Sequence, residues 1–155
     1  MKTLALVIAL FSVSSGFKIS PGPQFLATNG KYSYYINNAF YQPIEYIDTY
    51  CRQYRLLPAA IPDAAQNQFL YNALSRNVYP GSQVAIGLRS DNGNSTFFWL
   101  DGVTKYNYTN VRTDVAAPGT QFYALILNHP NLGGKWTPYP PNTVIQGAIC
   151  EQIIA

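Results

Sequence analysis

Two cysteines, Cys51 and Cys150, are the only ones among the 155 residues of the chain, and they lie 99 positions apart. If they form a disulfide, the bond closes most of the chain into one loop and ties an early segment to the last one. In the chain-entropy account, a loop of that size stabilises the folded state by about 4.7 kcal/mol. The alternative is two free thiols, and the compartment in which the chain folds decides between them.

The first sixteen residues predict a secretory signal peptide. Lys2 is followed by an apolar run from Leu4 to Val13, and small residues lead up to a cleavage site after Gly16. A membrane anchor would need about 20 apolar residues in a row, and this run is about half that length. We therefore expect a secreted, extracellular protein. An oxidising compartment then favours the Cys51–Cys150 disulfide over two free thiols.

Two sequons fit the same compartment. Asn94-Ser95-Thr96 and Asn107-Tyr108-Thr109 predict N-glycosylation at Asn94 and Asn107, both in surface loops.

Composition excludes several other classes of protein. Charged residues make up 11% and hydrophobic residues 48%, which is untypical of a disordered chain or a coiled coil. The basic residues are spread along the sequence, whereas a nucleic-acid-binding surface would need them clustered. The 13 Tyr and 8 Phe favour strands over a helical bundle.

Two helices are predicted in the first half of the chain. Apolar residues follow Pro43 at helical spacing: Ile44, Ile47, Cys51 and Tyr54. Asp63, three positions before Gln66, predicts the N-terminal cap of a second helix.

The remaining signals are short strands. Runs rich in aromatic and β-branched residues predict strands at 31–36, 83–88, 96–100, 121–127 and 147–151. Residues 101–120 lack periodicity and predict a long loop, and long ordered loops are often functional. Residues 17–30, rich in Pro and Gly near their ends, are interpreted as a linker or N-terminal arm. The chain is thus predicted to be an α+β protein with one domain over residues 31–153.

Six short motifs stand in a fixed order along this domain: Leu57-Pro58-Ala59-Ala60-Ile61, Gln66-Asn67-Gln68-Phe69-Leu70, Ala85-Ile86-Gly87-Leu88, Trp99-Leu100-Asp101-Gly102, Gly134-Lys135-Trp136 and Ile149-Cys150-Glu151. Together they resemble the landmarks of the C-type lectin-like domain. The resemblance implies two helices, small antiparallel sheets, a long loop region, and an outer disulfide that matches Cys51 and Cys150. Trp99 and Trp136 are then expected in the core.

The sequence departs from the sugar-binding members of that family at the positions that hold calcium. Those members have a Glu-Pro-Asn or Gln-Pro-Asp tripeptide in the long loop and Asn-Asp directly after the last tryptophan. Here Pro118 lies between Ala117 and Gly119, and Thr137 and Pro138 follow Trp136. Calcium takes six to eight oxygen ligands, and Asp114 is the one acid in the loop beyond Asp101. We expect no metal site and no cofactor.

The inner disulfide of the family is also missing. Tyr123-Ala124 and Pro140-Pro141 stand where its two cysteines are found, so the floor of the loop must be held by packing, with Tyr123 and Tyr139 as candidates.

Little in the sequence supports catalysis. His129 is the only histidine, and no nucleophile-and-base or metal-ligand spacing surrounds it. Asp101 and Asp114 could form a carboxylate pair for glycosidic chemistry, but the resemblance places Asp101 in a structural turn. The chain is therefore predicted not to be an enzyme.

Two functions remain open. The first is a recognition module that binds an extracellular protein or carbohydrate without calcium, with no nucleic acid and no membrane span. Its candidate binding residues are Lys105, Tyr106, Tyr108, Arg112, Asp114, Thr137 and Tyr139. The alternative is a structural or self-associating secreted or surface-coat component that pairs through an aromatic-rich stretch: Tyr32, Tyr34, Tyr35, Phe40 and Tyr41.

Overall fold

The computed structural model describes residues 22–93, 96–115, 119, 121–127 and 130–154. The predicted signal peptide, the Asn94 sequon and His129 lie outside these residues.

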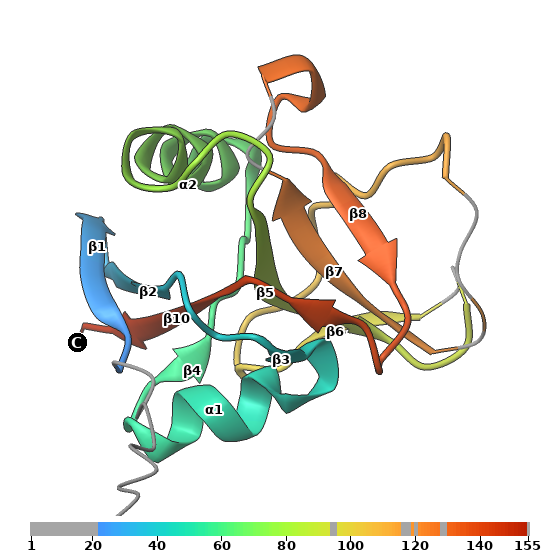
Figure 1. The fold of residues 1–155 in the computed structure, drawn as a ribbon, viewed down its shortest axis with the longest axis horizontal. Helices are drawn as coiled ribbons and strands as arrows, with labels where there is room; N and C mark the ends of the chain where they lie inside the picture. Colours follow the sequence, from blue (N-terminus) through green and yellow to red (C-terminus); the bar gives the residue numbers. More distant parts are fainter. Residues whose placement is uncertain (1–21, 94–95, 116–118, 120, 128–129, 155) are drawn as a thin grey trace, which may run out of the picture.

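One mixed sheet organises the fold (Figure 1). Its main path runs in the order β1 (Gln24–Asn29), β2 (Tyr32–Asn37), β10 (Gly147–Ile153), β5 (Gln83–Ser90), β7 (Phe122–Leu127) and β8 (Trp136–Tyr139). Strand β4 (Leu57–Pro58) pairs with β10, and β6 (Phe97–Trp99) pairs with β5. Strands β10 and β5 run parallel, whereas their other partners are antiparallel. A second small sheet joins β3 (Gln42–Pro43) to β9 (Val144–Ile145).

Two α-helices cover the central strands from opposite sides (Figure 1). On one side a 3-10 turn, η1 (Ile44–Tyr46), leads into α1 (Ile47–Gln53), and on the other lies α2 (Ala64–Asn77). A further 3-10 turn, η2 (Pro130–Leu132), precedes β8. The predicted cap of α2 is confirmed, since the Asp63 carboxylate accepts a hydrogen bond from the Gln66 backbone N–H at 2.7 Å. The predicted α+β class is therefore correct.

The core has two parts. The larger cluster includes Tyr34, Leu70 and both tryptophans, and Trp99 and Trp136 meet edge to face with ring centroids 5.5 Å apart. The smaller cluster surrounds the Cys51–Cys150 disulfide, whose Cα atoms are 5.6 Å apart. Both the disulfide and the burial of the two tryptophans were predicted and are confirmed.

Tyr123 and Tyr139 occupy the region where the family places its inner disulfide. They are directly opposed on β7 and β8, and both belong to the smaller core cluster. Side-chain packing therefore connects these two strands at the position where the family has a disulfide.

The interpretation of residues 17–30 as a linker or arm is wrong for residues 24–29. These residues form β1, which pairs with β2 along its length and so belongs to the sheet. Residues 17–21 lie outside the described part of the chain.

Candidate ligand-binding site

The long loop begins at a buried carboxylate. Asp101 is 5% exposed, and its oxygens accept hydrogen bonds from the backbone N–H groups of Val103 and Thr104 at 3.1–3.3 Å. These bonds turn the chain out of β6 and into the loop. The Asp101 carboxylate is thus committed to a turn, which leaves the hypothetical Asp101–Asp114 catalytic pair without support.

Two loop tyrosines anchor the loop to the sheet. The ring of Tyr106 stacks on Phe97 with centroids 5.0 Å apart, and Tyr108 packs edge to face against Trp136 at 5.5 Å. Partial burial raises the pKa of both phenols. Each tyrosine therefore presents only part of its ring to solvent.

The loop then runs beside β8 and extends the sheet. The Trp136 N–H donates to the Asn110 carbonyl at 2.9 Å, and the Arg112 N–H donates to the Trp136 carbonyl at 2.8 Å. The Asn110 side chain also donates to the Gly134 carbonyl at 2.9 Å. These bonds hold the backbone at Arg112 in one position relative to the core.

Arg112 and Asp114 form a two-point ion pair on this rigid segment. The guanidinium Nε and Nη2 atoms donate to the two carboxylate oxygens at 2.9 and 2.6 Å. The hydrogen bond from Arg112 holds the pKa of Asp114 below its usual value. The pair is exposed to solvent, so its contribution to stability is small.

The residues present do not fit a calcium ion of the kind that sugar-binding C-type lectins hold. Thr137 is 5% exposed, Pro138 is buried and has no side-chain oxygen, and both Asp114 oxygens are bonded to Arg112. Within the described ranges, no group of three or more His, Cys, Asp or Glu side chains is placed to hold a metal ion.

Two cavities adjoin at Arg112 and Thr113, which line both of them. One of about 380 Å³ is bounded by Asp114 and Lys135, and the other of about 310 Å³ by Phe97 and Tyr106. We call the surface formed by these six residues the loop face. It combines a charged half with an aromatic half, which suits a ligand with both polar and apolar groups.

The structure brings together only part of the predicted site. Arg112, Asp114 and Tyr106 lie on the loop face, and Tyr108 lies beneath the loop against Trp136. Lys105 is exposed but lines a different cavity, together with Lys31 and the exposed sequon residue Asn107.

Two of the predicted binding residues do not lie on the loop face. Thr137 is buried, and its hydroxyl has no hydrogen-bond partner within the described part of the chain. Tyr139 is half-buried, and its hydroxyl accepts a 3.5 Å hydrogen bond from Gln83.

Sequence reasoning missed Phe97 and Lys135 as surface residues of this site. Phe97 was interpreted only as part of a strand, and Lys135 only as part of a family motif. Phe97 lies on the same face of β6 as the buried Trp99, so the local pattern indicates packing against the core and gives no signal for a binding surface.

Known proteins were compared with this chain by sequence and by structure. No protein-family model matches the sequence. The chain is 34% identical over 104 residues to the secretory phospholipase A2 receptor of Mus musculus, a match that covers 66% of the chain but 6% of the receptor.

Solved structures match over most of their length. The C-type lectin CEL-I from Cucumaria echinata superimposes with a TM-score of 0.67 at 20% identity, covering 80% of this chain and 91% of CEL-I. A calcium-independent type II antifreeze protein superimposes with a TM-score of 0.64 at 15% identity, covering 83% and 92%.

The chain has the C-type lectin-like fold. Its sequence is divergent and lacks the calcium-binding tripeptide, the Asn-Asp pair and the inner cysteines. Among the described residues, no helix has the length and apolar character needed to cross a membrane.

Proposed function

We propose that the chain is a secreted recognition module that binds an extracellular protein or glycan through the loop face, without calcium and without catalysis. The observation that carries the proposal is the pair of adjoining cavities on a loop whose backbone is bonded to β8 at Asn110 and Arg112. A binding surface held rigid before the ligand arrives loses less entropy on association.

Three further observations support parts of this proposal. The Cys51–Cys150 disulfide fits an oxidising, extracellular compartment. The residues at the family's calcium positions offer no suitable set of oxygens. One structural neighbour is itself described as calcium-independent, so the fold is compatible with that property.

The test uses the glycosylated, oxidised full chain on a glycan array and in a binding screen against extracellular proteins, each with calcium or with a chelator. We expect a ligand whose binding is the same in both conditions. Arg112→Gln should weaken it at least about tenfold, or 1.4 kcal/mol, because it removes the charge between the two cavities. Calcium in the millimolar range should leave the melting temperature unchanged.

Arg52→Gln is the matched control, because Arg52 also forms an exposed ion pair, with Asp48 on α1. The proposal fails if the chelator abolishes binding, or if both arginine variants bind like the parent.

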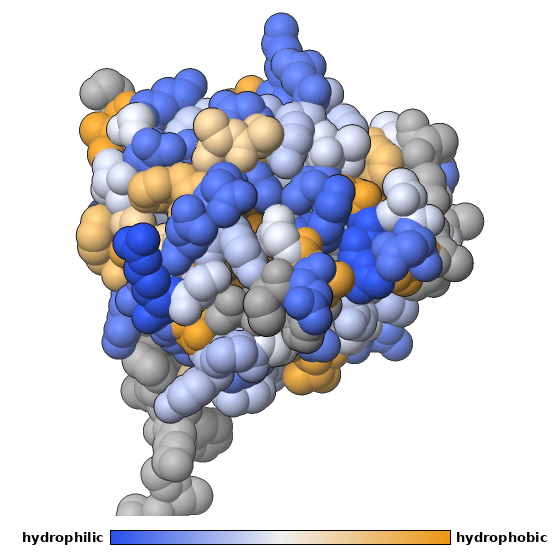
Figure 2. Space-filling view, turned by 90° about the horizontal axis from the view of Figure 1, so that it is seen from above, coloured by the Kyte–Doolittle hydropathy of each residue, from blue (hydrophilic) through white to orange (hydrophobic). Residues whose placement is uncertain are grey.

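The self-associating alternative has weaker support. Tyr34 and Phe40 are buried in the core, so the aromatic stretch cannot pair chains as a unit. Apolar side chains on the face in Figure 2 are scattered among polar ones. One favourable observation remains: β1 is an end strand of the sheet, and its Phe25 is 63% exposed. A concentration-dependent sedimentation coefficient that Phe25→Ser abolishes would favour this alternative.

A further inference from the structure

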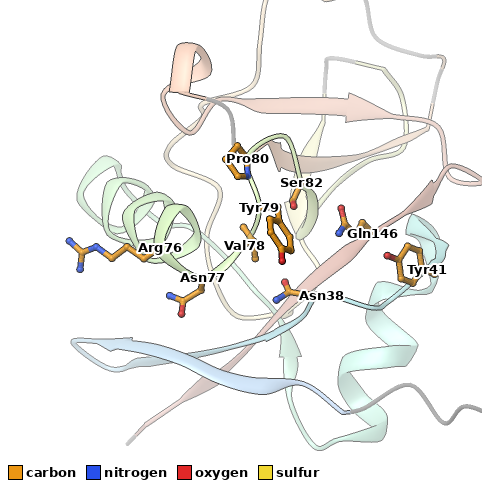
Figure 3. Close-up of a pocket in the computed structure, with 9 residues that line it drawn as sticks. All are labelled: Asn38, Tyr41, Arg76, Asn77, Val78, Tyr79, Pro80, Ser82 and Gln146. Carbon is orange, nitrogen blue, oxygen red and sulfur yellow. The ribbon is translucent and has the colours of Figure 1, made fainter.

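One cavity of the described structure is separate from the loop face. It measures about 580 Å³ and is formed by the β2–β3 connection, the end of α2, the approach to β5 and Gln146 between β9 and β10 (Figure 3). It shares no residue with the loop face. Its volume is within the range of small-ligand sites.

Two exposed tyrosines flank this cavity. Tyr41 is 64% exposed and Tyr79 is 83% exposed. In Figure 3 Gln146 lies between the two rings, and Asn38 lies below Tyr79 in this view. An aromatic ring that is exposed to solvent beside a concave site can pack against the apolar side of a ligand.

The position of Tyr41 is imposed by its backbone. Its φ is +43°, a left-handed conformation that costs a residue other than glycine of the order of 1 kcal/mol. The preceding residue, Phe40, is buried, and its N–H donates to the Gln146 carbonyl at 2.9 Å. The core thus holds Phe40 while Tyr41 is directed outward. Such strain is typical of functional positions.

Most polar side chains that line the cavity are neutral. Asn38, Asn77 and Gln146 have side-chain amides, which can both donate and accept hydrogen bonds, and the Asn77 amide already donates one bond to the Ala73 carbonyl at 2.7 Å. Arg76 is the one charged residue among the nine that line the cavity, and in Figure 3 its guanidinium points away from the others. The C-terminal end of α2, at Asn77, carries a partial negative charge, which disfavours an anion there.

We propose that this cavity is a calcium-independent binding site for a neutral saccharide. A sugar ring has an apolar C–H face that can pack on Tyr41 or Tyr79. Its hydroxyl groups both donate and accept, as the amides of Asn38, Asn77 and Gln146 do. A proline-rich peptide would also pack on the tyrosines, but its carbonyl groups only accept, so it would use half of this hydrogen-bonding capacity.

The experiment is an NMR titration of the ¹⁵N-labelled, oxidised full chain in the presence of a chelator. The probes are maltotriose, cellotriose, chitotriose and mannotriose, with decaproline as the peptide probe. We expect at least one saccharide to bind in the millimolar range or tighter and to shift the side-chain amide signals of Asn38, Asn77 and Gln146. The signals of Arg112 and Thr113 should not move.

Variants then assign the site. Tyr79→Ala should weaken saccharide binding at least about tenfold, or 1.4 kcal/mol. Because Tyr79 is 83% exposed, this substitution removes no core side chain, and Gln146→Ala gives a second, independent variant. Tyr46→Ala is the matched control, because Tyr46 is 49% exposed and does not line the cavity.

Three results would overturn the proposal: no saccharide binds, binding shifts only the loop face, or the Tyr79 and Gln146 variants bind like the parent. Decaproline shifting these amides when no saccharide does would also overturn it. All of these outcomes are independent of whether Arg112→Gln affects the separate ligand of the loop face.

Discussion

Glu151 is fully buried next to Cys150, and only one of its carboxyl oxygens has a partner. Oε2 accepts a hydrogen bond from the Ala60 N–H at 3.0 Å, whereas Oε1 has no partner among the described residues. Burial raises the pKa of this carboxyl to about 8, and the Ala60 hydrogen bond opposes that rise. The side chain is therefore mostly protonated at neutral pH.

Stability should consequently depend on pH through Glu151. The pKa is raised in the folded state above its ordinary value of 4.5, so the folded state binds this proton more tightly than the unfolded state. The contribution of Glu151 to the free energy of unfolding should be greatest below pH 4.5 and should fall up to about pH 8, by at most about 1.4 kcal/mol per pH unit.

Urea unfolding of the parent and of Glu151→Gln across this range measures the effect. The variant cannot ionise, so the difference between the two profiles should shrink or reverse in favour of the variant as the pH rises. Parallel profiles would show that Glu151 does not titrate in this window.

At the scale of elements, one side chain joins α2 to β8. Asn67 accepts a 2.7 Å hydrogen bond from the Trp136 indole N–H, and its amide nitrogen donates to the Gly134 carbonyl at 3.3 Å. Asn67 and Trp136 are both buried. The helix thus positions the tryptophan against which Tyr108 and the long loop pack.

Asn67→Ala should lower the free energy of unfolding by about 1–3 kcal/mol, because it leaves a buried indole N–H without an acceptor. Asn72→Ala, on the exposed side of the same helix, is the control and should change it by less than about 0.5 kcal/mol. Chemical denaturation of both variants checks the prediction. Because Ala is a better helix former than Asn, helix propensity cannot produce a loss, and equal losses in the two variants would mean that the indole hydrogen bond does not account for the change.

The elements that the sequence predicted are those with a strong local signal. Helical spacing and the Asp63 cap predicted both helices, and short runs of strand-favouring residues predicted β2, β5, β6, β7 and β10. Strand β1 was missed although Asn29-Gly30, between two strand-like runs, is a typical hairpin signal, and Gly30 has a φ of +56°. The local signal for β8 is weak, because Pro138 argues against a strand, yet β8 is at the end of the sheet, where proline is tolerated.

At the scale of the whole molecule, the disulfide connects α1 to the central strand β10. Replacing Cys51 and Cys150 together by Ala should reduce the free energy of unfolding by a few kcal/mol, with about 4.7 kcal/mol as the entropic estimate for a loop of 99 residues. Thermal denaturation of the double variant measures the loss. A melting temperature equal to that of the parent would show that core packing alone holds these elements together.

The candidate sites show why surfaces built from distant segments were harder to predict than single helices and strands. The long loop was recognised from its lack of periodicity, and Tyr106, Arg112 and Asp114 do lie on its surface. Thr137 was misplaced because both faces of β8 are covered, which depends on the neighbouring packing and not on local sequence. The tyrosine-flanked cavity is assembled from segments far apart in the chain, none of which is unusual alone.

The central place of β10 has a consequence for the timing of folding. This strand pairs with β2, β4 and β5, so none of those contacts can form until the ribosome has made the last part of the domain. At 5–20 residues per second, Cys51 waits about 5–20 s for Cys150, which is 99 positions later. During that interval Cys51 has no native disulfide partner, so the speed of translation sets how long this thiol stays unpaired.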